Sequence, residues 1–524
     1  MIVLHDSPNS DLKRIQAMAD IEEEFALFDY VRIRIEQSNK SWIGQVIEPN
    51  RNISTVGNPL DPTILHGLKL MQSGRDIQSV ESVQVFEILI LGEEVGSQRL
   101  TSRIRPLPGA TVEKLDTETI NRVIGIPQQA VHADGGSNVI GELLNADQVP
   151  LCIDARILNH HVMIAGGTGS GKSNVAANVI EQAMKFDKCV LVHDAKPDYG
   201  LIGSKNSDAS VETVWERFHK YGLTPHSPAD IRRVGFHGKC DSDRVDIVAG
   251  CRASDLAPAM LAGFFFPETS EQLQFEGFVR AADSIEQNPY SLDDILRVVT
   301  DRIGLNTADG IHSTTGQTIL RKVESRRAEM SWLDVVGQTI TGHGEKKVFN
   351  FNFQVDRGRI LVIDYSQMDD SSYALLLSYV LQYCQSKRSS RTGVGIVQMV
   401  DEAHRIFDNE SRHSDTLASL FNRIMREGRT FDHSVVLSLQ NASQIPRLVM
   451  NNLNTNIVMR QNSRNEADYA TQTMGRDFSV RALELGTGQA LIKMFESQDV
   501  VPVQMAPSPF ELMRSDNTGQ NTNA

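Results

Sequence analysis

A glycine-rich loop that ends in lysine and serine is the strongest chemical signal in the sequence. Residues 166–173 read Gly-Gly-Thr-Gly-Ser-Gly-Lys-Ser and match the pattern G-x-x-x-x-G-K-[ST]. In such a loop the backbone N–H groups point at phosphate oxygens, Lys172 reaches the β and γ phosphates, and Ser173 offers its hydroxyl to Mg²⁺. The loop therefore predicts binding of a nucleoside triphosphate with Mg²⁺. The residues expected at the phosphates are Gly167, Thr168, Gly169, Ser170, Gly171, Lys172, Ser173 and Asn174.

A second segment supplies the carboxylates that hydrolysis would need. Residues 395–400 are mostly apolar and are followed directly by Asp401 and Glu402. Because ligands of open α/β sheets collect at the carboxyl ends of the strands, both acids are expected at the phosphate site. Asp401 would hold the Mg²⁺ shell, and Glu402 would polarise the attacking water. A pair of helix-capping acids is the competing interpretation, which the phosphate loop makes the weaker one.

Two further polar segments follow strand-like runs and could complete the site. Gln440 comes after the apolar run 434–439, where its amide could sense the γ-phosphate or position water. An ordinary polar strand end explains Gln440 equally well when it is taken alone. The segment 193–199, His-Asp-Ala-Lys-Pro-Asp-Tyr, ends another such run, so its acids and Lys196 are expected either to face the same site or to cap the next helix.

Basic residues that precede Gln440 could act on a neighbouring subunit. The segment 423–429 reads Arg-Ile-Met-Arg-Glu-Gly-Arg. Its guanidinium groups could stabilise the charge that develops on a nucleotide held by another copy of the chain. A solvated basic helix end is the competing interpretation.

The segments above require a sheet that brings several strand ends together. From about Asn159, apolar strand-like runs alternate with helical segments, which predicts an α/β fold with a mostly parallel sheet covered on both faces. A capping-box pattern at 291–294 and apolar residues at helical spacing indicate that 210–344 forms a helical insertion. The expected strands are 161–165, 188–193, 359–364, 395–400, 434–439, 456–459 and 489–494, and a helix is expected to begin near Asn174.

The first hundred residues show strand signals more than helical ones. In the run 30–36, apolar and charged residues alternate, which predicts a strand with one buried face. Further strands are expected at 42–47, 83–91 and 102–105, and together they predict a small β-barrel, preceded by a helix within 11–28. The expected domains are a barrel at 1–115, an α/β core at 116–209 and 345–505, the insertion at 210–344 and a C-terminal tail at 506–524.

Composition narrows the class of protein. The 524 residues predict about three structural units. Lys and Arg total 52 against 66 Asp and Glu, and the net charge of −14 argues against a uniformly basic surface that would coat nucleic acid or membranes. Any polyanion site must therefore be local, such as the lining of a channel. Five Cys without a CxxC pair, the absence of a leader pattern and the absence of a long apolar run predict a cytoplasmic protein that does not enter membranes.

The order of these motifs resembles one family, the HerA-like hexameric DNA translocases, which are relatives of FtsK and of the conjugative coupling ATPases. The phosphate loop and the acidic strand are common to many NTPases, whereas the spacing from Arg-Glu-Gly-Arg to Gln after Asp-Glu-Ala-His is much more specific. The matching segments are GxTGSGKS at 166–173, Asp-x-Lys-x-Asp-Tyr at 194–199, Val-Asp-Glu-Ala-His at 400–404, Arg-Glu-Gly-Arg at 426–429, Ser-Leu-Gln at 438–440 and Gly-Gln-Ala at 488–490.

The resemblance implies a RecA-like core with an N-terminal small β-barrel and a helical-bundle insertion. It implies a homohexamer that binds ATP and Mg²⁺ between subunits and threads double-stranded DNA through a central channel. The chain departs from the family's pattern at His160-His161, where relatives often carry Arg-His, and a phosphate contact usually given to that Arg is therefore in doubt. The implied roles are phosphate and Mg²⁺ binding for Lys172 and Ser173, the acidic pair for Asp401 and Glu402, the sensor for Gln440, and the arginine finger for Arg426 or, as second choice, Arg429.

Motors of this family engage separate effector proteins. The resemblance therefore implies a partner nuclease in DNA end processing, or a nuclease or sirtuin-like enzyme in anti-phage defence. The alternative is an ATP-bound ring that activates an effector with little DNA movement, and a small-molecule kinase is disfavoured because no compact lid or acceptor motif accompanies the loop. Candidates for contact with DNA, most of which ordinary surface charge also explains, are Lys205, Arg232, Arg233, Arg321, Lys322, Arg326 and Arg327.

Overall fold

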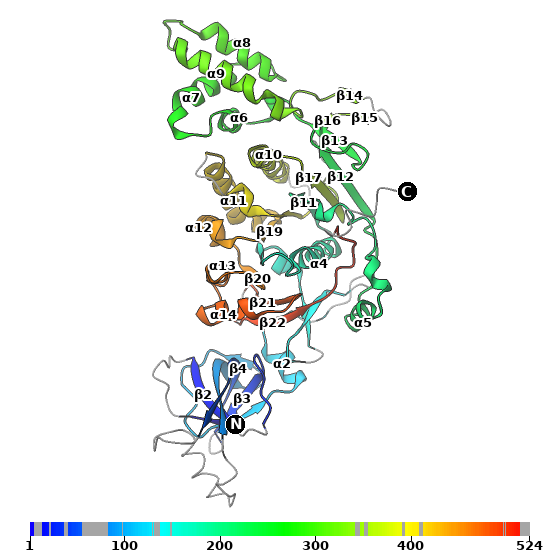
Figure 1. Cartoon of the computed structure of the whole chain (residues 1–524), viewed down its shortest axis with the longest axis vertical. Helices are drawn as coiled ribbons and strands as arrows, with labels where there is room; N and C mark the ends of the chain where they lie inside the picture. Colours follow the sequence, from blue (N-terminus) through cyan, green and yellow to red (C-terminus); the bar gives the residue numbers. More distant parts are fainter. Residues whose placement is uncertain are drawn as a thin grey trace, which may run out of the picture. The chain divides into compact units, whose positions relative to one another are not determined.

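The computed structural model of the chain divides into two compact units (Figure 1). The first unit comprises residues 1–129, 141–152 and 492–505, and the second comprises residues 130–140, 153–491 and 506–524. The first unit thus extends past the barrel boundary expected at residue 115. The residues whose structure is described are 1–4, 13–19, 23–35, 40–54, 82–96, 98–127, 129, 137–146, 149–340, 346–350, 355–389, 393–407, 412–495, 497 and 499–513.

The first unit contains the small antiparallel barrel that the sequence predicted. Its strands follow the order β2-β1-β7-β3-β4-β5, and a further pairing of β2 with β5 closes the six-stranded ring. The alternation predicted for 30–36 is confirmed over Tyr30–Arg34, because Val31 and Ile33 are buried against Trp42 in the barrel core. The strands are β1 (Ile2–Val3), β2 (Arg14–Ala19), β3 (Tyr30–Arg34), β4 (Ser41–Ser54), β5 (Ser82–Val95) and β7 (Thr111–Lys114), with β6 (Gln98–Leu100) paired to β5.

Two predictions for this unit are wrong. The helix expected within 11–28 is replaced by β2, in which Ile15 and Ala17 alternate with more exposed residues and point into the barrel core. The strand expected at 102–105 does not form, because this segment folds over the Trp42 indole instead. The indole N–H lies within hydrogen-bond distance of the Ser102 hydroxyl (3.0 Å) and of the Ile104 carbonyl (3.1 Å).

The remaining elements of the first unit are short. Strand β22 (Val501–Met505) pairs antiparallel with β8 (Val139–Leu143). Helix α2 (Thr117–Val123) begins at Asp116, whose carboxylate accepts the Thr119 backbone N–H at 2.8 Å. Strand β9 (Pro150–Cys152) completes the set.

The second unit is built on the predicted parallel sheet. Its strands follow the order β16-β13-β12-β17-β11-β18-β19-β10-β20-β21, so each sequence-predicted strand of the sheet is confirmed to within about two residues. The strands are β10 (Val162–Ala165), β11 (Cys189–Asp194), β12 (Asp230–Phe236), β13 (Ile247–Gly250), β16 (Phe349–Asn350), β17 (Arg359–Asp364), β18 (Ile396–Val400), β19 (His433–Leu439), β20 (Thr455–Met459) and β21 (Gln489–Lys493).

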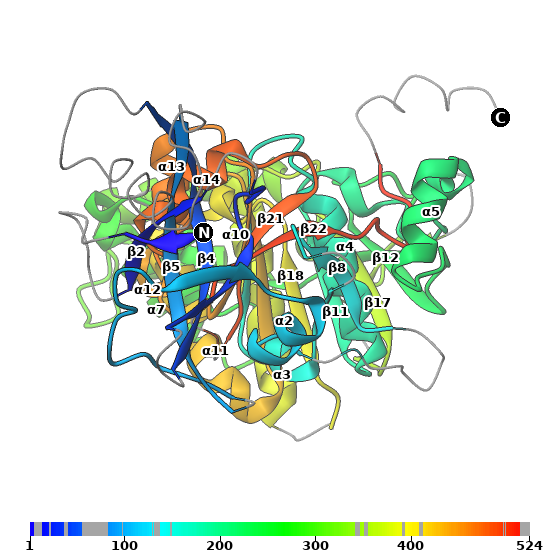
Figure 2. The same ribbon diagram turned by 90° about the horizontal axis from the view of Figure 1, so that it is seen from below.

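Helices cover both faces of this sheet, as expected. The chain passes from β10 to β11 in one direction along the sheet and from β17 to β18 to β19 in the other. Right-handed crossovers therefore place α4 (Lys172–Lys185) on one face and α10 (Asp370–Ser389) and α11 (Arg412–Phe431) on the opposite face. Figures 1 and 2 show this division, with α4 on the side away from α10 and α11.

The segment 210–344 contains both helices and strands. A cluster of α6 (Pro258–Phe265), α7 (Gln272–Asp283), α8 (Leu292–Arg302) and α9 (Ser313–Arg326) forms a group at one end of the unit in Figure 1. The predicted capping box is confirmed, with Ser291 and Asp294 hydrogen-bonded to each other's backbone N–H. The mainly helical prediction is wrong for β12 and β13, because two arginines interrupt the apolar run of β12 and β13 is only four residues long.

The C-terminal segment after β22 packs on the second unit as far as it is described. The Asn174 side chain donates to the Ala506 carbonyl at 2.7 Å and accepts from the Ser508 backbone N–H at 2.6 Å. Phe510 is buried and forms an isolated β-bridge with Lys205. The polar end of the expected tail, residues 514–524, lies outside the described residues.

Candidate nucleotide-binding and hydrolysis site

The glycine-rich loop connects β10 to α4, which is the strand-loop-helix context that the motif requires. The Gly166 N–H donates to the Leu439 carbonyl (3.1 Å) and the Gly167 N–H to the Arg460 carbonyl (2.8 Å), so the loop is pinned to the ends of β19 and β20. Gly171 caps α4 with a φ of 105°, a left-handed conformation that residues with a Cβ rarely adopt. The sequence therefore needs glycine here for backbone geometry.

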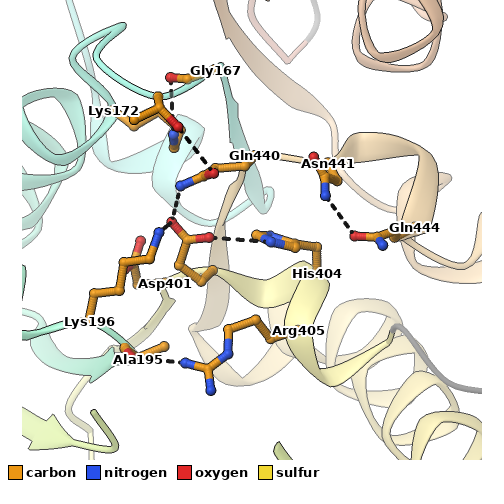
Figure 3. Close-up of polar contacts among 12 residues, drawn as sticks. Gly167, Lys172, Ala195, Lys196, Asp401, His404, Arg405, Gln440, Asn441 and Gln444 are labelled. Atoms are coloured by element: carbon orange, nitrogen blue, oxygen red, sulfur yellow. Dashed lines mark hydrogen bonds and ion pairs between the residues drawn. The ribbon is translucent and has the colours of Figure 1, made fainter. Parts of the chain in front are cut away.

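Lys172 is buried inside the loop. Its ammonium group donates to the Gly166 carbonyl at 2.8 Å. It also donates to the Gly167 carbonyl at 3.3 Å (Figure 3). Burial lowers the pKa of Lys172, while the carboxylates of Glu402 and Asp401 act in the opposite direction. A phosphate oxygen entering the loop would meet a cation already aimed at it.

Asp401 follows β18 directly and is almost fully buried. Burial, and then repulsion by Glu402, raises its pKa to about 7. One of its carboxylate oxygens, Oδ2, has no hydrogen-bond partner among the described residues, and the same is true of Oδ1 of the buried Asp194. Buried carboxylate oxygens without donors are costly unless a cation satisfies them, and this observation fits Mg²⁺ at the site.

Ser173 and a turn after β11 supply further oxygen ligands. The Ser173 hydroxyl donates to Asp198 Oδ2 at 2.9 Å. Asp198 lies in the short 3-10 turn Pro197–Tyr199, which is held by a hydrogen bond from the Tyr199 N–H to Asp194 (3.1 Å). Among the described residues, no group of three or more His, Cys, Asp or Glu could hold a metal alone. Mg²⁺ typically takes only one or two protein oxygens and completes its shell with water and phosphate, so Ser173 and Asp401 suffice.

Glu402 is held by three side chains from three different segments. Its Oε1 atom accepts from Lys196 Nζ at 2.8 Å and from Gln440 Nε2 at 2.6 Å. Its Oε2 atom lies 3.3 Å from His404 Nε2. Figure 3 shows the side chains of Lys196, Gln440 and His404 pointing toward one carboxylate. The amide of Gln440 also connects to the loop, because Thr168 Oγ1 lies 3.4 Å from Gln440 Oε1. The structure thus brings the phosphate loop, the acidic strand and Gln440 to one edge of the sheet.

Arg426 lies at the other edge of the same sheet. It is exposed on α11, next to Met425, whose carbonyl lies 2.8 Å from the His161 ring at the start of β10. The four residues of β10 span about 13 Å and end at the phosphate loop, so Arg426 cannot reach the loop of its own chain. Only the backbone of Arg429 is described, as part of α11.

His160 and His161 also lie at the start of β10, away from the phosphate loop. Burial lowers the pKa of His161 to about 4, so its ring is neutral near pH 7. Its Nδ1 atom accepts the Val435 N–H at 3.1 Å, and its Nε2 faces the Met425 carbonyl. His161 therefore joins β10, β19 and α11 as a structural residue.

The sequence motifs predicted Asn174 at the phosphates and left out Asn462, which lies against the phosphate loop. The Asn174 side chain is occupied by the C-terminal segment at Ala506 and Ser508. Asn462 packs so closely on Gly167 that a Cβ at that glycine would collide with its amide group. Its signal was available, because Asn462 follows β20 just as Gln440 follows β19.

The basic residues considered for DNA contact mostly have partners within the chain. Lys322 pairs with Glu271, Arg326 with Glu329 and Arg327 with Asp293 on the helical cluster. Arg233 donates to the Gly200 carbonyl at 2.9 Å. These contacts favour ordinary surface charge as the interpretation of these basic residues.

None of the helices in the described part of the chain has the length and apolar character that crossing a bilayer requires.

Comparison with known proteins points to one family. The family model described as the central domain of helicase HerA matches residues 138–384. The chain is 22% identical over 465 residues to a probable DNA double-strand break repair helicase HerA from Methanocaldococcus jannaschii, covering 80% of this chain and 86% of that protein. It is also 22% identical over 474 residues to the DNA double-strand break repair helicase HerA of Sulfurisphaera tokodaii, covering 88% of this chain and 84% of that protein.

Solved structures with a similar fold include the plasmid coupling protein TrwB in complex with a non-hydrolysable ATP analogue. The likeness covers 76% of this chain and 94% of the TrwB chain, with 12% sequence identity and a TM-score of 0.49.

Proposed function

Because the chain is a HerA-like P-loop ATPase, we propose that it hydrolyses ATP with Mg²⁺ and couples hydrolysis to movement along double-stranded DNA. The observation that carries the proposal is the link from Thr168 through Gln440 to Glu402, which joins the phosphate loop to the acidic strand. The relatives named as DNA repair helicases support the choice of DNA as the track.

The proposed chemistry assigns one task to each residue. Lys172 and the loop N–H groups bind the phosphates, and the Ser173 hydroxyl and the Asp401 carboxylate hold Mg²⁺, which draws charge from the phosphate oxygens when bound. Glu402 takes a proton from the attacking water or orients it, and Gln440 detects the γ-phosphate. The remaining loop residues, Gly167 to Gly171, act through their backbone N–H groups.

A ring of identical subunits would complete this site. Arg426 is exposed and lies at the edge of the sheet opposite its own phosphate loop, so only another copy of the chain can present it to a nucleotide. We therefore propose Arg426, or Arg429 as second choice, as an arginine finger donated across subunits of a homohexamer with DNA in its central channel. Isolated subunits would then hydrolyse ATP slowly.

The proposed setting is the cytoplasm, in DNA end processing or anti-phage defence, with a separate nuclease or sirtuin-like effector as partner. All five cysteines are free thiols, which suits a reducing compartment. An ATP-bound ring that activates its effector with little DNA movement is the second candidate. The contacts made by both Glu402 oxygens favour this second candidate. A general base whose oxygens already accept hydrogen bonds activates water slowly, and ATP hydrolysis is then slow.

ATP hydrolysis with and without linear duplex DNA tests the proposal, on a sample whose oligomeric mass is known. The wild-type ring is expected to hydrolyse ATP faster when DNA is present, and Lys172→Ala provides the blank. A ring that binds ATP but ignores DNA would contradict the motor function. Glu402→Gln then separates the two candidates, since a scaffold that binds ATP without hydrolysing it should still activate its effector.

A further inference from the structure

The side chain of Glu402 has little room to accept a proton as the structure stands. A carboxylate has about four lone-pair positions, two on each oxygen. Lys196 and Gln440 use both positions on Oε1, and His404 faces Oε2. At most one lone-pair position, on Oε2, is then left for the attacking water, so this arrangement restrains Glu402 and is a resting one.

The backbone around these side chains is fixed on both sides. Glu402 has a φ of 48°, a left-handed conformation that a residue with a Cβ adopts only when its surroundings enforce it. Arg405, in the same turn, donates to the Ala195 carbonyl at 3.0 Å and so ties this turn to the residue before Lys196. A change between resting and active states must therefore occur by side-chain rotation.

Lys196 and Gln440 differ in how they can leave Glu402. Gln440 lies between Glu402 and Thr168 of the phosphate loop, so a γ-phosphate oxygen that accepts from its amide would remove its donor from Glu402. The Lys196 side chain is 46% exposed, whereas Glu402 is almost fully buried. Lys196 can therefore swing toward phosphate or solvent while Glu402 stays in place.

We propose that Lys196 is a positioning residue that, together with Gln440, holds Glu402 in the resting orientation until a γ-phosphate binds. The 2.8 Å contact between Lys196 Nζ and Glu402 Oε1 is the element that carries this inference. It rests on the proposed ATP hydrolysis and adds a restraint that keeps turnover slow. Lys196→Met removes the restraint, whereas Lys196→Arg retains a cation at the same place.

A simpler role for Lys196 would be to balance the acids of the site. In that role its loss would weaken binding of the triphosphate and raise KM for ATP, because a cation near the phosphates disappears. Loss of a restraint instead raises kcat and leaves KM unchanged. The two kinetic constants therefore separate the roles.

The test measures steady-state ATP hydrolysis by the full-length assembled protein with Mg²⁺ and without DNA. Lys196→Met should raise kcat by roughly two- to tenfold and leave KM unchanged. This factor corresponds to the free energy of one half-exposed, charge-assisted hydrogen bond. Lys196→Arg should keep the wild-type values. Lys220→Met is the matched control, because Lys220 is an exposed lysine at the end of α5 (Glu212–Lys220) with no place in the proposed site, and its substitution should change neither constant.

The outcomes that overturn the inference are distinct from failure of the proposed function. A fall in kcat, a change confined to KM, or equal behaviour of Lys196→Met and Lys196→Arg would overturn the restraint while leaving ATP hydrolysis intact. Absence of hydrolysis in the wild-type protein, with binding of a fluorescent ATP analogue preserved, would overturn the proposed ATPase function and the inference with it.

Discussion

Ser173 joins two parts of the site through a single hydroxyl group. It is the second residue of α4, and its Oγ donates to Asp198 on the turn after β11 at 2.9 Å. A Mg²⁺ ion bound by this hydroxyl would have Asp198 in its outer shell, where a carboxylate orients the inner ligands. The sequence left open whether the acids of 194–199 face the phosphate site or cap the next helix. This contact favours the first alternative for Asp198.

The Ser173 hydroxyl gives a sharp test at the level of one residue. Ser173→Ala should lower kcat for ATP by roughly ten- to hundredfold and raise the Mg²⁺ concentration needed for half-maximal activity, because a metal ligand is lost. Ser173→Thr keeps the hydroxyl and is the matched control, with activity close to wild type. Equal activity of the alanine and threonine variants would remove Ser173 from the metal site.

At the scale of elements, a buried polar network joins three neighbouring strands of the sheet. His193 Nε2 on β11 donates to Gln398 Oε1 on β18 at 2.8 Å, and Gln398 Nε2 donates to His433 Nε2 on β19 at 3.2 Å. Burial lowers the pKa of His193 to about 4, so the ring stays neutral in the folded sheet. The hydrogen bond to Gln398 persists when His193 is protonated, so the buried position of the charged ring is what would destabilise the folded sheet in acid.

This network predicts a defined response to acid. Below pH 6.5 the unfolded chain takes up a proton on His193 that the folded chain does not, so stability falls as the pH falls from 6.5 toward 4, by at most ~2 kcal/mol at pH 5. His193→Gln should be less stable at pH 7 by about 1 kcal/mol but lose less on acidification. Melting temperatures at pH 7 and pH 5 measure both effects.

A control and a contradicting result complete this experiment. His312→Gln changes an exposed histidine at the start of α9 whose ring contacts Thr314, and it should leave the difference between pH 7 and pH 5 as in wild type. If His193→Gln lost as much stability on acidification as the wild-type protein, the buried ring would not be a source of acid sensitivity.

The sequence predicted elements well where apolar periodicity decides the structure. Central strands of the parallel sheet such as β18 and β19 are wholly buried, so their continuous apolar runs located them. The rule that ligands collect at strand ends placed Glu402 and Gln440. It failed for β2 and β12, because a short alternating strand and a strand interrupted by arginines carry weak patterns. The contacts of Asn174 with the C-terminal segment depend on tertiary packing alone, which no local pattern reports.

At the scale of the whole molecule, one chain holds the two parts of the proposed catalytic site at opposite edges of one sheet. Lys172 and Glu402 lie at the carboxyl edge, and Arg426 lies at the amino edge, separated by at least the length of β10. Neither a hinge nor side-chain rotation closes that gap within a compact sheet. The proposed head-to-tail ring would do so without any change in the subunit, because each amino edge would meet the next carboxyl edge.

Mixed rings test this arrangement directly. Arg426→Ala subunits keep an intact phosphate loop, and Lys172→Ala subunits keep the arginine, so each variant alone should be almost inactive. In an equal mixture, about a quarter of the interfaces in a randomly assembled head-to-tail ring pair an intact loop with an intact arginine, and ATP hydrolysis should recover to about a quarter of the wild-type rate. The same mixture with Arg429→Ala in place of Arg426→Ala determines which arginine is used. A mixture no more active than the average of its two components would show that neither arginine acts across subunits.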